Sequence, residues 1–170
     1  MKRYGKHLAV IIGVTLSSLF LLSPIVLSHC EIPCGIYNDS MRINMIAEHI
    51  ATIEKAMNQI HKLSEDEDKN YNQLTRWIVN KEAHADKLTD IVTQYFMKQR
   101  IKPAEESDSS AYKKYVKELT LLHKLMVYSM KCKQTTDLDN VTKLRAALTE
   151  FEAAYMDKES SSMSEHKHQH

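Results

Sequence analysis

Glycine, proline and cysteine are scarce in this 170-residue chain, with three of each, and tryptophan occurs only once. After Gly35 there is no further glycine, and Pro103 is the only later proline. Glycine and proline are the residues that most strongly interrupt helices and strands. Their scarcity predicts long helices, and no segment shows the apolar–polar alternation that is typical of strands.

An excess of charge of either sign is also missing. Residues 29–170 carry 20 lysines and arginines against 22 aspartates and glutamates, which is close to neutral. A nucleic-acid-binding surface would need a strongly basic balance, so we expect no nucleic-acid partner. The stretch is long enough to form one domain with a substantial core.

The apolar residues predict an all-α fold, an antiparallel up-down four-helix bundle over residues 38–157. In the first helix, apolar residues recur at intervals of 3, 4, 3, 4 and 3 between Ile43 and Ile60. The four helices are expected at residues 39–63, 70–99, 109–132 and 138–157. Residues 158–170 are polar and serine-rich, which predicts a disordered tail. The expected core residues of the four helices are, in order, Ile43, Ile46, Ile50, Ile53, Met57 and Ile60; Leu74, Trp77, Ile78, Leu88, Ile91, Val92, Tyr95 and Phe96; Tyr112, Tyr115, Val116, Leu119, Leu122 and Met126; Val141, Leu144, Leu148, Phe151 and Tyr155.

Residues 1–28 have the pattern of a secretory signal peptide. A basic start precedes a mostly apolar run over residues 8–22, and Ser28 offers a point of cleavage. The run is shorter than the roughly 20 residues of a membrane-spanning helix. We therefore expect an exported protein, periplasmic or extracellular, with no membrane attachment after cleavage. The alternatives are an uncleaved anchor and a lipoprotein cut before Cys30.

Residues 29–37, His-Cys-Glu-Ile-Pro-Cys-Gly-Ile-Tyr, combine metal ligands with turn formers. Cys30 and Cys34 can converge on one ion if the chain between them turns, which the intervening proline favours. Cleavage before His29 would add an α-amine and an imidazole, and the amide nitrogen of Cys30 could then close a chelate ring. Amine, amide nitrogen and two thiolates form a square-planar set, which indicates nickel or copper in the +2 state.

This segment resembles the N-terminal hook of nickel-containing superoxide dismutases at every fixed position, namely His29, Cys30, Pro33, Cys34, Gly35 and Tyr37. The similarity continues through the helical region to about Tyr155. It implies a nickel ion bound by His29, Cys30 and Cys34. It also implies conversion of superoxide to dioxygen and hydrogen peroxide by Ni(II)/Ni(III) cycling, and a homohexameric assembly.

Tyr37 is the candidate catalytic residue that this resemblance implies. Its expected role is to stand over the open face of the metal, where it would limit access to small anions and order a water molecule. A simpler interpretation is that Tyr37 packs the hook on the bundle, and the two roles are compatible.

Around the hook the resemblance is less complete. Members of the family often have an arginine where this chain has His84, and Asn44 is the nearest counterpart of their hook-orienting glutamate. Glu82 and His84 are expected to face the hook from the second helix. The remaining candidate ligands are expected to be surface, incidental or structural groups, with a metal-scavenging tail as the alternative for the last three: His49, His61, His123, Cys132, His166, His168 and His170.

A non-enzymatic exported bundle is the alternative from another functional class. It would be a metal carrier, or a structural protein with a Cys30–Cys34 disulfide, and would use the same thiols without turnover. The mature N-terminus distinguishes the two hypotheses, because only a chain that begins at His29 supplies amine, imidazole and amide together.

Overall fold

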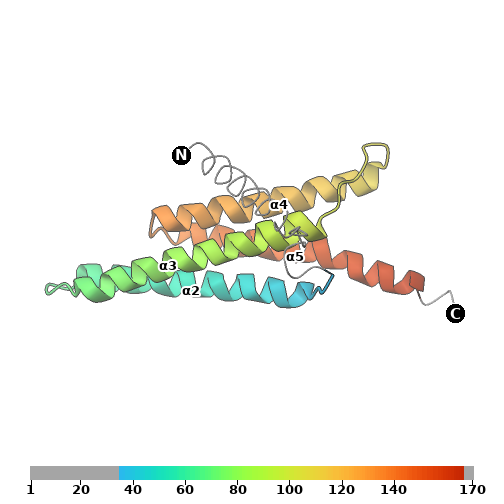
Figure 1. The fold of residues 1–170 in the computed structure, drawn as a ribbon. Coiled ribbons are helices and arrows are strands. Elements are labelled where there is room, and N and C mark those ends of the chain that lie inside the picture. Colours follow the sequence, from blue (N-terminus) through green and yellow to red (C-terminus); the bar gives the residue numbers. More distant parts are fainter. Residues whose placement is uncertain (1–34, 167–170) are drawn as a thin grey trace, which may run out of the picture. The chain divides into compact units, whose positions relative to one another are not determined.

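A computed structural model describes residues 35–166 of the chain, with side chains up to residue 156. Its helices belong to one compact unit, Pro33–His170. In chain order they are α2 (Asp39–Glu65), α3 (Tyr71–Asp90), the π-helix η1 (Ile91–Arg100), α4 (Ser109–Gln134) and α5 (Asp139–His166) (Figure 1). The described range contains no strand, and the predicted all-α class is confirmed.

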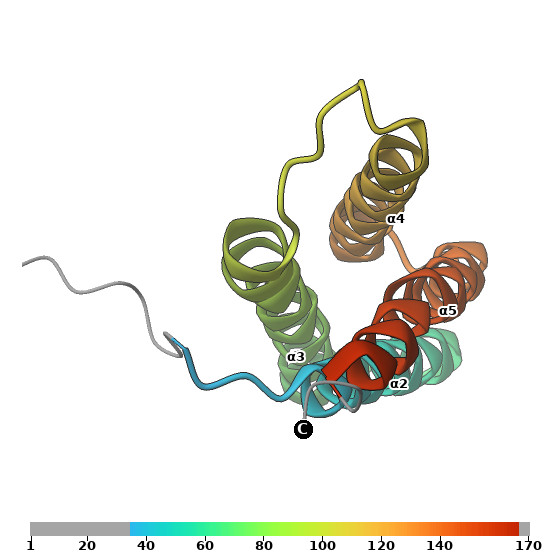
Figure 2. The ribbon, with the colours of Figure 1, turned by 90° about the vertical axis from the view of Figure 1, so that its right-hand side faces the viewer.

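The helices alternate in direction and form a four-helix bundle. α2 packs against α3 and α5, and α4 packs against the same two helices. Viewed from one end, the four helices occupy four corners (Figure 2). None of the helices within residues 35–166 is long and apolar enough to cross a lipid bilayer.

Three of the helices begin with the same cap. A side-chain oxygen of Asn38, Asn70 or Asp108 accepts a hydrogen bond from the backbone N–H three residues later, at 2.9, 3.1 and 3.0 Å. Such caps satisfy N–H groups that have no partner within the helix. The helices accordingly start within one residue of the predicted positions.

The helix ends agree less well with the prediction. α5 continues to His166, beyond the expected end at residue 157. No glycine or proline lies between Asp139 and His166, so nothing in that sequence stops the helix. Residues 167–170, the end of the predicted tail, lie outside the described range.

The predicted core is confirmed in α2 and α5, where every expected apolar residue is buried. It is only partly right in α4, where Leu122 is fully buried, Tyr115, Leu119 and Met126 are half-buried against the core, and Val116 is exposed. The buried stripe of α4 is rotated by about one residue and consists of Glu118, Leu121, Leu122, Leu125, Ser129 and Cys132. Two overlapping apolar stripes run along this helix, and periodicity alone does not show which one faces the bundle.

The first half of α3 also departs from the prediction. Ile78 is 37% exposed, and Leu74 and Trp77 are only half-buried, although all three were expected in the core. In Figure 1 the turn between α2 and α3 projects beyond the turn between α4 and α5. This part of α3 therefore has fewer neighbours within the chain than its second half.

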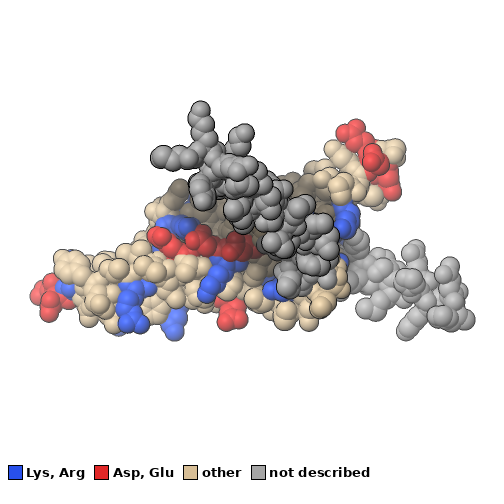
Figure 3. All heavy atoms as spheres, in the orientation of Figure 1, with Lys and Arg blue, Asp and Glu red and all other residues tan. Residues whose placement is uncertain are grey.

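Basic and acidic residues are interspersed on the face drawn in Figure 3. Acidic atoms gather at the loop between η1 and α4, which contains Glu105, Glu106 and Asp108. Elsewhere on the described part of this face, the two signs of charge lie side by side.

Candidate metal centre

The predicted nickel ligands His29, Cys30 and Cys34 lie outside the described residues, as does the predicted signal peptide. What the structure shows is the base of the hook, from Gly35 to the first turn of α2. Gly35 has a φ angle of 75°, in the left-handed region that strains any residue with a side chain. This backbone angle is a physical reason for glycine directly after the second predicted thiolate.

Tyr37 packs on the bundle. The guanidinium carbon of Arg100 lies 4.3 Å from the centre of the Tyr37 ring. The ring of Tyr95 meets it edge to face, with centroids 5.9 Å apart and an interplanar angle of 75°. Both contacts are favourable for an aromatic ring. Tyr37 remains 40% exposed, so part of its surface is free on the side away from these contacts.

Asp39, the first residue of α2, holds this arrangement together. Its side chain is buried, and its carboxylate accepts hydrogen bonds from the hydroxyls of Tyr95, at 2.5 Å, and Tyr155, at 2.8 Å. Arg100 donates from Nε to both carboxylate oxygens, at 2.9 and 3.1 Å, and from Nη2 to Oδ2. The position at a helix N-terminus adds to the stabilisation of the negative charge. Asp39 thus joins the start of α2 to η1 and α5.

The π-helical form of η1 explains how Tyr95 and Arg100 reach the same carboxylate. Residues five apart lie nearly above one another in a π-helix, because its hydrogen bonds join residues i and i+5. In an α-helix they would point about 140° apart. The hydrogen bond from the N–H of Ile101 to the carbonyl of Phe96, at 2.9 Å, has this π spacing.

The charges within the cluster balance. Burial alone would raise the pKa of Asp39, but the hydrogen bonds from Arg100, Tyr95 and Tyr155 outweigh it, so the pKa is lowered. Burial and the bond to Asp39 raise the pKa of Tyr95 to about 12, and the same causes raise the pKa of Tyr155. At neutral pH the cluster therefore contains one carboxylate, one guanidinium and two neutral phenols. Neither phenol is poised to release a proton near neutral pH.

A second guanidinium lies beside this cluster. Arg42 places its guanidinium carbon 5.1 Å from the centre of the Tyr95 ring. Its Nη1 contacts the sulfur of Met45 at 3.7 Å, while its Nε is buried without a hydrogen-bond partner among the described residues. Arg42 therefore adds a positive charge beside a cluster whose own charges balance.

His84 has a partner that the sequence did not indicate. Its Nδ1 lies 3.1 Å from Nδ1 of His49, across the contact between α3 and α2, and the rings meet at 76°. One nitrogen must carry the proton and the other accept it. Burial is the main cause that lowers the pKa of both residues. His49, expected to be a surface or structural histidine, is half-buried and paired with His84, whereas Asn44, the nearest counterpart of the family's hook-orienting glutamate, is exposed.

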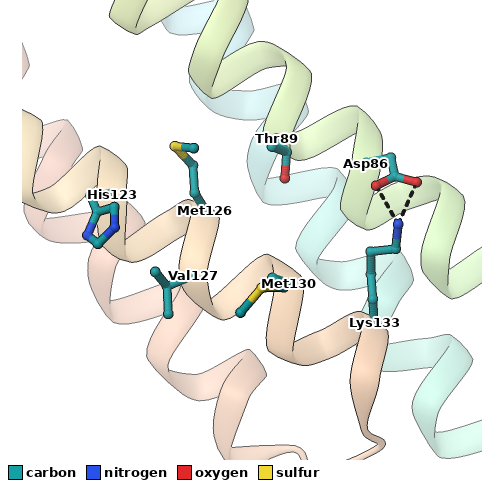
Figure 4. A pocket seen from close by; sticks show the side chains of 7 residues that line it. All are labelled: Asp86, Thr89, His123, Met126, Val127, Met130 and Lys133. Carbon is teal, nitrogen blue, oxygen red and sulfur yellow. Dashed lines mark hydrogen bonds and ion pairs between the residues drawn. The ribbon is translucent and has the colours of Figure 1, made fainter.

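A hollow of about 360 Å³ lies between α3 and α4. The ion pair between Lys133 and Asp86, 2.8 Å apart, lies along it, and methionine side chains from α4 line its apolar part (Figure 4). Its lining is Asp86, Thr89, His123, Met126, Val127, Met130 and Lys133. Nowhere in the described part of the chain do three or more histidine, cysteine, aspartate or glutamate side chains form a group that could hold a metal ion.

Sequence reasoning missed the cluster under Tyr37. The sequence predicted Tyr95 and Tyr155 as core residues and indicated no role for Asp39 or Arg100. The available signal was weak, since the four residues come from three elements that are far apart in the chain. Only the packing of α2 against η1 and α5 brings them together.

Comparison with known proteins gives one match. The family model for nickel-containing superoxide dismutase matches residues 24–159, which include all the predicted hook residues and the helices up to most of α5. Searches of curated proteins and of solved structures found no match. Because the family match spans most of the chain, this protein belongs to the nickel-containing superoxide dismutase family, and it is an oxidoreductase that uses nickel to dismutate superoxide.

Proposed function

We propose that the nickel of this dismutase is bound by the first residues of a mature chain that begins at His29. The groups that would hold the ion are the α-amine and imidazole of His29, the amide nitrogen and thiolate of Cys30 and the thiolate of Cys34. The observation that carries the proposal is the family match, which spans this segment together with the bundle. The chemistry of the donors agrees, because thiolates and nitrogen ligands in a square plane suit nickel.

Nickel supplies one-electron redox chemistry when it is bound in such a site. The thiolates of Cys30 and Cys34 and the deprotonated amide of Cys30 donate negative charge, which makes the higher oxidation state accessible. Tyr37 allows only small anions such as superoxide to reach the metal. Outer groups of this kind commonly set the orientation and the potential of a metal site.

The proposed ligand set requires export, because the α-amine of His29 exists only after cleavage at Ser28. Residues 1–28 act as the signal peptide in this proposal, and the mature enzyme is periplasmic or extracellular. An oxidising compartment favours a Cys30–Cys34 disulfide, so nickel must bind before the thiols are oxidised or after they are reduced.

We further propose that the enzyme is a homohexamer. The first half of α3 supports this, since Tyr71 is 70% and Val79 61% exposed beside the exposed Ile78. An exposed apolar stripe suits a subunit interface, where a second copy covers it.

The decisive experiment compares two proteins that differ by one residue. One begins at His29, and the other carries a single additional alanine before it; intact mass verifies both. We expect nickel binding and dismutase activity only in the first, because the extension replaces the amine ligand with an amide. Full activity in the extended protein would contradict the ligand set.

Two cysteine variants separate the enzyme from a passive metal carrier. Cys30→Ser and Cys34→Ser should each abolish activity while circular dichroism shows the bundle intact, since a serine hydroxyl is a much weaker ligand for nickel. Cys132→Ser is the matched control and should retain activity, because this cysteine is buried in the bundle. A wild type that binds nickel through both thiols but lacks turnover would favour the carrier hypothesis.

A further inference from the structure

We propose that Arg100, fixed by Asp39, is a positioning residue that holds the ring of Tyr37 in place at the base of the nickel hook. This inference rests on the proposed role of Tyr37 as a screen for the metal. It assigns that screen a support built from η1 and α5, which neither the family match nor the hook sequence indicates.

The contacts of Tyr37 carry the first step. Among the described residues, two groups restrain its ring, the guanidinium of Arg100 at 4.3 Å and the ring of Tyr95 at 5.9 Å. Its neighbour Ile36 is 79% exposed and offers little packing of its own. The ring position therefore depends on Arg100 and Tyr95.

The second step is that one carboxylate fixes both restraints. Asp39 accepts hydrogen bonds from Arg100 and from the Tyr95 hydroxyl, and Tyr155 on α5 fixes the carboxylate from the other side. The rings of Phe96, Phe151 and Tyr155 pack against one another in the core, with ring centroids 5.0 to 5.5 Å apart. The support of Tyr37 is thus continuous with the rigid core.

The shape of arginine carries the third step. A guanidinium is flat and can donate to a carboxylate along its edge while its face lies on an aromatic ring. Arg100 does both, to Asp39 and to Tyr37. A lysine at this position could retain the ion pair with Asp39 but could not stack in the same way. Arg100→Lys therefore separates the loss of stacking from the loss of charge.

The first test observes the ring without nickel. Protein labelled with 3-fluorotyrosine gives one fluorine resonance for each tyrosine, and the signal missing in Tyr37→Phe identifies Tyr37. We expect this signal to lie away from that of free fluorotyrosine in the wild type and to move toward it in Arg100→Lys. Arg145→Lys is the matched control, because Arg145 forms a comparable pair with Glu54 on the outside of the bundle. An unchanged Tyr37 signal in Arg100→Lys would overturn the proposal.

Arg100→Gln alone would leave the buried Asp39 without its counter-charge and could unfold the protein. The double variant Asp39→Asn/Arg100→Gln removes both charges together and serves as the second test. In this variant the Tyr37 signal should move as far as in Arg100→Lys or further, with the helical circular dichroism retained. A folded double variant with a wild-type Tyr37 signal would refute the proposal.

The third test uses azide, a small anion, as an inhibitor of the nickel-loaded enzyme. Arg100→Lys should change the azide inhibition constant by roughly three- to tenfold, a range typical of coupling between residues in contact. The same substitution in a Tyr37→Ala background should have no further effect, because Arg100 acts through the Tyr37 ring. Equal effects in both backgrounds would show that Arg100 acts on the anion directly and would overturn the inference. A wild type without dismutase activity would count against the proposed function, whereas the fluorine spectra would still decide the role of Arg100.

Discussion

Lys81 should be one of the largest single contributors to the stability of the bundle. Its side chain is buried in α3, and its ammonium group donates hydrogen bonds to the carbonyls of Cys132, Lys133 and Thr135 at 2.7, 2.6 and 3.2 Å. These carbonyls lie at the C-terminus of α4, where helix geometry leaves them without partners. The buried ammonium group of Lys81 thus caps the C-terminus of α4 and links this helix to α3.

The substitution Lys81→Met keeps the length of the side chain and removes the charge. A hydrogen bond to a charged group contributes roughly 1.5–3 kcal/mol, and a partly buried cation at a helix C-terminus up to about 2 kcal/mol. Two effects oppose the loss. Burial lowers the pKa of Lys81, so removing the ammonium recovers part of its desolvation cost, and water can reach the carbonyls at the rim. We expect a net loss of about 3 kcal/mol, mostly from the buried carbonyl of Cys132.

Thermal unfolding followed by circular dichroism at 222 nm measures this effect. A loss of that size should lower the midpoint by roughly 6–12 °C in a domain of this length. All samples need the same protein concentration, because assembly also contributes to the midpoint. Lys133→Met is the control, since Lys133 only pairs with the exposed Asp86 and should leave the midpoint nearly unchanged. If Lys81→Met melted within 1 °C of the wild type, or the control melted equally early, the reasoning would be wrong.

Three further predictions concern other parts of the molecule. Burial lowers the folded-state pKa of His49 and His84, so their contribution to stability should be complete above the unfolded-state pKa of about 6.5 and fall as the pH drops through that value. Chemical denaturation at pH 5 and at pH 7.5 measures this change in stability. The change should be smaller in His84→Gln than in the wild type or in the control His61→Gln. Val79→Asp, on the exposed stripe of α3, should shift native mass spectra from the hexamer to smaller species without loss of helicity. The control Thr142→Asp, also at an exposed position, should leave the hexamer intact, and an intact Val79→Asp hexamer would place the interface elsewhere. Burial raises the pKa of Cys132 to about 11, so iodoacetamide at pH 8 should modify it only after unfolding, and mass spectrometry of a rapidly modified Cys132 in folded protein would contradict its burial.

Much of the fold could be predicted because the apolar spacing in α2 and α5 is regular and breaks are few. The prediction lost accuracy where two faces of a helix are both apolar, as in α4. It also overstated the core in the first half of α3, where apolar residues such as Ile78 remain exposed in the single chain. The periodicity of apolar residues predicts which side chains are buried. It does not distinguish burial in the core of one chain from burial in a contact between chains.

The hook and its base differ in how far sequence could reveal them. The hook motif is local, since nine consecutive residues contain every proposed ligand; their types indicate a nickel or copper site, and the resemblance to the family implies nickel. The base is not local, because Asp39, Arg100 and Tyr155 come from separate elements. An aspartate at the start of a helix is usually a cap exposed to solvent, and nothing in its neighbours shows that this one is buried.

The π-helix η1 is the element through which the core supports Tyr37, at the base of the predicted hook. With α-helical spacing, Tyr95 and Arg100 would point to different faces, so a sequence read with a period of 3.6 assigns Tyr95 to the core and leaves Arg100 in solvent. The π spacing brings both to Asp39, while the next residue, Phe96, still packs against Phe151 in the core. A π-helix is less favourable than an α-helix and frequently occurs at functional sites. η1 ends directly at the loop to α4 and contacts Tyr37 through Tyr95 and Arg100, so the local cost of the π-helix agrees with the role proposed for Arg100.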